Sequence, residues 1–220
     1  MEFAVLIPLR GGSKGIPRKN LKPMALKPLC FWSIEAALEL EVPVYISTED
    51  PEIKETIANS YQSVLFVDRP SRLAQDSSST EDVIDHFFSV VSPSNILLIQ
   101  ATSPLTRGAH LSEAIKLFKE NNRRPLVSCV RKHQFLWGED GRPINYNPEA
   151  RPRRQDWDGC LIENGAFYIF SREAYLLHRC RCAPPVTLYE MSSIHGIEVD
   201  DLTDWNLVES LLHLRLGQIS

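Results

Sequence analysis

The sequence predicts an α/β fold in which helices cover both faces of a mostly parallel sheet. Short apolar runs of strand length alternate with longer segments of helical periodicity. This alternation is typical of parallel strands joined by right-handed helical crossovers. We expect strands near residues 3–9, 43–47, 64–67, 95–100 and 126–130, and helices near 28–41, 51–60, 80–91 and 107–121.

The alternation stops between about residues 131 and 163. This stretch contains three large aromatic residues, Trp137, Tyr146 and Trp157, and has no helical period. It is too short to build its own core, so we interpret it as an insertion within a single domain of residues 1–220. Beyond it we expect strands over Gly165–Phe170, Val186–Tyr189 and Ile194–Val199, and a final amphipathic helix from about Thr203 to Leu216.

The composition is that of an ordinary globular protein, with 43% hydrophobic and 24% charged residues. The formal net charge of −4 gives no overall attraction to nucleic acid or to an anionic membrane. No apolar run approaches the roughly 18 residues of a membrane-spanning helix. No secretory leader precedes the first strand, and the 5 cysteines are an odd number. We therefore expect a cytoplasmic protein with free thiols, and neither nucleic acid nor membrane as a partner.

A glycine-rich basic loop follows the first predicted strand. Its sequence is Arg10-Gly-Gly-Ser-Lys-Gly-Ile-Pro-Arg-Lys-Asn20. Glycines let backbone N–H groups turn toward an anion, which makes Gly11, Gly12 and Ser13 candidates for a phosphate-binding nest. The spacing matches neither the dinucleotide-binding fingerprint nor the Walker loop. We interpret the loop as a polyanion site in which Arg10 and Lys14 neutralise charge, with a merely solvated loop as the alternative.

Two carboxylates near the carboxyl terminus, Glu198 and Asp200, are candidates for metal binding. Positions two apart on a strand face the same side, so both side chains are expected to enter one space. Hard carboxylate oxygens suit Mg²⁺, which we expect as the cofactor. We interpret the neighbouring Asp201 and Asp204 as caps of the final helix.

Several further segments accompany the basic loop in a fixed order along the chain. They are Ile46–Asp50, Arg69–Thr80, Gln100–Leu105, Arg131–Phe135 and Arg151–Gly159. Together with the loop, they resemble the N-acylneuraminate cytidylyltransferases, and the last two segments resemble the animal-type members of that family. The family commonly has Asp-x-Asp where this chain has Glu198-Val-Asp200.

The resemblance implies a three-layer, Rossmann-like nucleotide-diphospho-sugar transferase fold, with residues 131–163 as the dimerisation element of a homodimer. It implies catalytic roles for Arg10, Lys14 and Asp200, and metal ligation by Asp200 and Glu198. Nucleotide contacts are expected from Gly11, Gly12, Ser13, Asn20, Arg69, Thr80 and Gln100. Contacts to a sugar acid are expected from Gln100, Thr102, Ser103, Arg151, Arg154 and Asn164. Without the resemblance, Thr80 is an ordinary N-cap and Asp76 a turn residue.

The implied reaction transfers CMP from CTP to a nine-carbon 2-keto sugar acid, either N-acetylneuraminate or Kdn, and releases pyrophosphate. One alternative is a cytidylyltransferase for legionaminate, pseudaminate or an eight-carbon acid. A second is a non-catalytic nucleotide- or RNA-binding protein that uses the basic run Arg151-Pro-Arg-Arg154. In an animal protein the same run is also a candidate nuclear-targeting signal.

Overall fold

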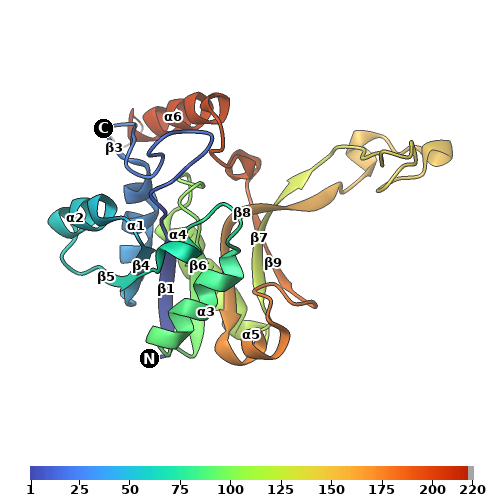
Figure 1. The fold of residues 1–220 in the computed structure, drawn as a ribbon. Coiled ribbons are helices and arrows are strands. Elements are labelled where there is room, and N and C mark those ends of the chain that lie inside the picture. The colour runs from blue at the N-terminus through green and yellow to red at the C-terminus, as the bar shows by residue number, and fades with distance from the viewer. Residues whose placement is uncertain (218–220) are drawn as a thin grey trace.

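In the computed structural model, which describes residues 1–217, seven strands form the main sheet in the order β5-β4-β1-β6-β8-β7-β9 (Figure 1). The predicted domain's last residues, 218–220, lie outside the described part. The strands are β1 (Phe3–Pro8), β4 (Val44–Thr48), β5 (Leu65–Asp68), β6 (Asn95–Ile99), β7 (Leu126–Lys132), β8 (Cys160–Ser171) and β9 (Thr187–Met191). A separate hairpin pairs β2 (Pro23–Met24) with β3 (Lys27–Pro28).

The sheet is mostly parallel, as predicted. β1 pairs in parallel with β4 and β6, and β7 pairs in parallel with β9. β8 is the exception, because it runs antiparallel to both β6 and β7. The carboxyl ends of the parallel strands therefore meet at one edge, where ligands bind in open α/β sheets.

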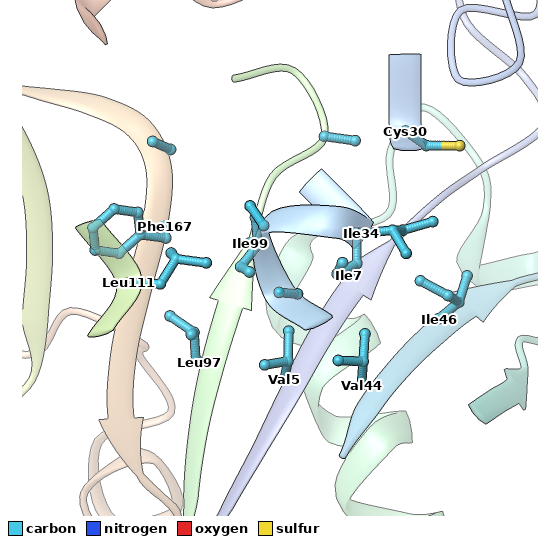
Figure 2. Packing of buried hydrophobic residues seen from close by; sticks show 14 of the residues in the cluster. Val5, Ile7, Cys30, Ile34, Val44, Ile46, Leu97, Ile99, Leu111 and Phe167 are labelled. Atoms are coloured by element: carbon cyan, nitrogen blue, oxygen red, sulfur yellow. The ribbon is translucent and has the colours of Figure 1, made fainter. Parts of the chain in front are cut away.

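Helices cover both faces of the sheet, which confirms the three-layer prediction. The helices are α1 (Leu29–Leu38), α2 (Pro51–Ser60), α3 (Thr80–Val90), α4 (Gly108–Glu120), α5 (Arg172–His178) and α6 (Leu202–Gly217). Alternate residues of β1 face opposite sides: Val5 and Ile7 pack with α1, α2 and α4, while Ala4 and Leu6 pack with α3 and α5. Figure 2 shows the first of these cores, with Ile34 and Leu111 over the strands. None of the described helices has the length and apolarity needed to span a bilayer.

A third apolar cluster joins the two ends of the chain. Trp205, Val208 and Leu212 of α6 are buried with Ile16 of the basic loop and Met24 of the hairpin. Val199, in the loop that leads into α6, belongs to the same cluster. Burying large side chains in this way typically contributes about 1.5–3 kcal/mol each. The cluster therefore holds the segment around residue 200 against the amino-terminal loop.

The predicted insertion forms an arm that projects away from the sheet between β7 and β8 (Figure 1). The strands take up the ends of the predicted range, because β7 extends to Lys132 and β8 begins at Cys160. In the arm, the rings of Phe135 and Trp157 stack with centroids 4.7 Å apart, and Tyr146 lies 4.3 Å from Phe135. Aromatic contacts between distant parts of the insertion thus order it, and its helical structure is limited to two short 3-10 turns.

The predicted strand at Ile194–Val199 is wrong. A 3-10 turn occupies Ser193–Gly196, and no strand includes residues 197–201. The turn buries His195, whose ring lies 4.6 Å from that of His110 on α4. The apolar run therefore packs as a turn and a loop against the sheet edge. The final helix at Leu202–Gly217 confirms the remaining prediction for this region.

Candidate active site

A buried ion pair anchors the basic loop to the ends of β4 and β5. The Arg69 side chain, 4% exposed, donates from Nη2 to Glu49 Oε2 at 2.7 Å and to the Leu9 carbonyl at 2.9 Å. The other carboxylate oxygen of Glu49 accepts from the Gly11 N–H at 2.8 Å. One carboxylate thus fixes both a candidate nucleotide-binding arginine and the start of the loop.

Two of the three loop glycines, Gly11 and Gly15, serve close approach, and none of the three has a positive φ. A Cβ at Gly11 would lie 2.0 Å from Asp50 Oδ2, and one at Gly15 would lie 2.3 Å from the Asp200 carbonyl oxygen. Asp50 caps α2 and pairs with Arg18 of the loop, which holds the pKa of Asp50 below its ordinary value. The predicted role of these glycines in a phosphate-binding nest stays a prediction, and the close approaches give a second reason for glycine at residues 11 and 15.

Arg10 and Lys14 converge on the carboxylate of Asp76. Arg10 Nη1 lies 2.8 Å from Oδ1, and Lys14 Nζ lies 2.9 Å from Oδ2. Both cations keep the pKa of Asp76 below its ordinary value, with the hydrogen bond from Lys14 contributing most. Asp76 is therefore more than a turn residue, because it brings the two candidate catalytic cations to one point.

A cavity of about 330 Å³, here called the loop cavity, lies where these segments meet. Its lining includes Arg10, Gly12, Ser13, Asn20, Arg69, Thr80, Gln100, Thr102 and Asp200 from the predicted set. Thr80 is the first residue of α3 and not its N-cap; Ser79 caps the helix through a capping box with Asp82. Asn20 positions the loop by donating to the Arg10 carbonyl at 2.9 Å.

A second cavity of about 400 Å³, here called the polar cavity, adjoins the first. It is lined by Gln100, Thr102, Glu163, Gly165, Tyr168, Arg181 and Glu198. Gln100 and Thr102 line both cavities, so the segment after β6 forms their common wall. A larger groove of about 990 Å³ lies where β6 and β7 begin and β8 ends, and none of the predicted site residues lines it.

Asp200 meets the basic loop, as the sequence predicts, although its contact is with Lys19. Lys19 Nζ lies 3.3 Å from Asp200 Oδ1 and donates to the Val199 carbonyl at 2.7 Å. Glu198 lines the neighbouring polar cavity, where burial and then the charges of Asp200 and Glu163 raise its pKa. The two carboxylates therefore come from a loop and border adjacent cavities, in place of the shared strand face that we expected.

The carboxylate pair suits Mg²⁺ better than a metal that needs an all-protein ligand set. Among the described residues, no group of three or more His, Cys, Asp or Glu is placed to hold a metal ion. Mg²⁺ is usually held by one or two carboxylates together with water and substrate phosphates. Asp200, exposed at the loop cavity, fits that pattern, and the mutual repulsion of Asp200 and Glu198 is what a divalent cation would relieve.

Two predicted substrate-binding residues face the protein interior. Asn164 is 3% exposed and donates to the His195 carbonyl at 2.9 Å. Ser103 is also 3% exposed, and its backbone N–H donates to the Gln100 carbonyl at 3.2 Å. Neither residue lines the loop cavity or the polar cavity, and their direct contact with substrate stays a prediction. They support the loops that line both cavities.

Arg151 and Arg154 do not join the site of their own chain. Both lie in the arm, and the Arg151 guanidinium lies 4.4 Å above the centroid of the Phe135 ring. Neither arginine lines the loop cavity or the polar cavity. Contact of these arginines with a sugar acid therefore stays a prediction that depends on a partner chain.

The chain resembles known cytidylyltransferases over nearly its whole length. A family model described as Cytidylyltransferase matches residues 4–215. The chain is 38% identical over 225 positions to N-acylneuraminate cytidylyltransferase A of Danio rerio, covering 98% of this chain and 51% of that protein. Identity to N-acylneuraminate cytidylyltransferase of Streptococcus agalactiae serotype V is 29% over 216 positions, covering 93% and 52%. The higher identity to the fish protein agrees with the animal-type motifs, and the chain spans about half the length of these curated relatives.

Solved structures confirm the fold class. CMP:2-keto-3-deoxy-manno-octonic acid synthetase, solved in complex with CTP, matches with a TM-score of 0.73 at 17% identity, covering 98% of this chain and 100% of that one. The 4-diphosphocytidyl-2C-methyl-D-erythritol synthase of Anaerococcus prevotii matches with a TM-score of 0.69 at 11% identity, covering 96% of each. The architecture is therefore the predicted Rossmann-like nucleotide-diphospho-sugar transferase fold.

Proposed function

Because the chain belongs to the cytidylyltransferase family, we propose that it transfers CMP from CTP to the anomeric hydroxyl of a nine-carbon 2-keto sugar acid. The observation that carries this proposal is the common wall of Gln100 and Thr102 between a basic cavity and a polar one. Such a wall would allow a triphosphate and a polyhydroxylated acid to bind side by side. Proximity and alignment of this kind are the main requirement of phosphoryl transfer.

In the proposed step, the anomeric hydroxyl oxygen forms a bond to the α-phosphorus of CTP. The bond from that phosphorus to the bridging oxygen of the β-phosphate breaks, the hydroxyl proton passes to solvent, and pyrophosphate leaves. Arg10 and Lys14, gathered at Asp76, neutralise charge on the triphosphate. The Gly12 and Ser13 backbone borders the same cavity and is suited to the phosphate oxygens.

Mg²⁺ is the proposed cofactor, with Asp200 as its main ligand and Glu198 as a second. When bound, the ion would polarise the phosphate oxygens and orient the leaving group. Lys19 holds the Asp200 segment against the basic loop. Val199, next to Asp200, is buried together with residues of the following helix α6. The backbone that carries the Asp200 carboxylate is therefore held in place.

We include in the proposal a homodimer in which the arm of a second copy covers the polar cavity. The arm is an ordered aromatic projection that makes no part of the site of its own chain (Figure 1). Exchange of arms would bring Arg151 and Arg154 to a substrate carboxylate, which arginine binds in a bidentate manner. The free cysteines of the described chain support a reducing compartment, and we propose the cytoplasm.

The test is pyrophosphate release from CTP with Mg²⁺ and a panel of 2-keto sugar acids. Arg10→Gln removes one phosphate-facing cation and is expected to lower kcat by about 100- to 1,000-fold. Asp200→Asn is expected to lower the apparent affinity for Mg²⁺ in the same assay. Lys116→Gln, on the exposed side of α4, is the matched control and should retain activity. No release with any acid would overturn the proposal.

A further inference from the structure

The polar cavity has an unusually hydrophilic lining for a site that accepts a sugar acid with an acyl group. Gln100, Thr102, Glu163, Gly165, Tyr168, Arg181 and Glu198 line it, and this described set contains no aliphatic side chain. Hydroxyl groups of a ligand would find donors and acceptors there. The methyl group of an acetamido substituent would find little apolar surface there to compensate its burial, because the lining's main apolar group is the Tyr168 ring and the Arg181 guanidinium lies over that ring.

A chain of polar contacts links the residues of this lining. The Tyr168 hydroxyl donates to the Glu163 carboxylate, and burial raises the pKa of Tyr168, so the hydroxyl stays protonated. The Arg181 guanidinium lies 4.5 Å from the centroid of the Tyr168 ring, and its Nη1 is 2.5 Å from Glu81 Oε1. These contacts hold the charged groups in place, so the cavity does not become apolar by a simple rotation of one side chain.

Arg181 is the one cation among the described residues that line the polar cavity. Its side chain is 21% exposed, and its buried Nε has no hydrogen-bond partner within the described chain. The Glu163 carboxylate is an acceptor for ligand hydroxyls, while Arg181 is a donor for a hydroxyl oxygen. A hydroxyl can use both kinds of group, since it donates and accepts.

We propose that the polar cavity selects a nonulosonic acid with a hydroxyl in place of the acylamido group, and that Arg181 and Glu163 determine this preference. This inference rests on the proposed function and names its substrate class. An acetamido group can also donate and accept, so the discrimination rests on its methyl group, which would cover polar groups of this lining and leave them unpaired. The expected preference in kcat/KM for the deaminated acid Kdn over N-acetylneuraminate is at least about tenfold.

An apolar depression of about 260 Å³ next to the polar cavity offers a competing place for a methyl group. It is lined by Val127, Cys129, Leu161, Cys182, Val186 and Leu188, and it shares Glu163 with the polar cavity. Glu163 lines both cavities, so its charged carboxylate, which accepts a hydrogen bond from Tyr168, lies at their boundary. This contact disfavours the apolar depression as the acyl site.

The experiment compares pyrophosphate release with Kdn and with N-acetylneuraminate at saturating CTP and Mg²⁺. Arg181→Met should raise KM for Kdn at least about tenfold, reduce the preference and leave KM for CTP unchanged. Arg181→Lys should retain most of the preference. The matched control is Arg179→Met in the same segment, because Arg179 pairs with Asp85 and does not line the polar cavity. Thermal melting of each variant checks that it is folded.

The outcomes separate this inference from the proposed function. If pyrophosphate is released with neither acid, the proposed function itself is wrong. Release with both acids, with N-acetylneuraminate equal or preferred, overturns the inference and leaves the function standing. A selective loss of N-acetylneuraminate turnover in Leu188→Ser would place the methyl group in the apolar depression and would also overturn it. Should Arg181→Met be unfolded, Glu163→Gln serves as the second variant, with a reduced Kdn preference expected.

Discussion

Replacing Glu49 with alanine removes the carboxylate that links Arg69 to the start of the basic loop at Gly11. In the native structure, Glu49 accepts from Arg69 at 2.7 Å and from the Gly11 N–H at 2.8 Å. The Glu49 and Arg69 side chains are 15% and 4% exposed, so solvent replaces little of the lost interaction. Glu49→Ala would leave a buried guanidinium paired only with the Leu9 carbonyl.

The magnitude follows from that burial. Breaking a buried ion pair by removing one partner costs about 3–5 kcal/mol, because the remaining charge is uncompensated. In a domain of this size, each kcal/mol lowers Tm by about 2–4 °C, so a decrease of about 6–20 °C is expected. Glu49→Gln combined with Arg69→Met removes both charges, and its loss of stability should be smaller than the sum of the two single losses.

Thermal and urea denaturation monitored by circular dichroism measure the effect. The control is Lys54→Ala, which removes an exposed ion pair with Asp68 and should cost less than about 1 kcal/mol. CTP affinity is measured in parallel, because the Gly11 anchor is lost with Glu49. If Glu49→Ala is no less stable than Lys54→Ala, the buried pair does not hold the loop and the reasoning is refuted.

Two further predictions concern the same loop. In Gly15→Ala, the new Cβ would lie 2.3 Å from the backbone oxygen of Asp200, so the two segments must separate and CTP affinity should fall by at least about tenfold. Unchanged affinity in calorimetry would contradict the close approach. Arg18 depresses the pKa of Asp50, so this pair stabilises the fold above the ordinary aspartate value of 3.8, and that stability is lost as the pH falls below it. Asp50→Asn keeps a capping oxygen and should weaken the dependence of Tm on acid pH; an unaltered dependence would count against the linkage.

The sequence predicts the layers and the location of the site because both follow from strong local patterns. Apolar periodicity identifies the strands and helices, and parallel strands place the loops after β1 and β6 at one sheet edge. The meeting of Asp200 with the basic loop depends on a buried cluster between α6 and Ile16. That contact joins residues near opposite ends of the chain. Local sequence patterns do not predict such a contact, and here the resemblance to a family did.

The roles of residues that act through a partner from another loop were harder to predict than the motifs themselves. Glu49 and Asp76 lie inside the recognised segments, but their roles depend on Arg69, Arg10 and Lys14 from other loops. The sequence alone does not show which cations from other loops come close to a given carboxylate, so it does not predict these ion pairs.

The differences between the sequence prediction and the structure have the same origin in long-range packing. The run Ile194–Val199 has the apolar content of a strand, yet a turn buries His195 against α4 in its place. Asn164 matches a family position, but its amide is used within the core. Local composition does not determine which edge of the sheet a short segment contacts.

The convergence of the basic loop and Asp200 on one metal-bound triphosphate is tested most directly by paramagnetic broadening of amide signals. Mn²⁺ would replace Mg²⁺ in the presence of CTP, without the acid substrate. The account predicts selective broadening of the amide signals of Gly11, Gly12 and Ser13, and a marked reduction of that broadening in Asp200→Asn. Broadening that spares these loop amides, or that is the same in Asp200→Asn, would contradict it.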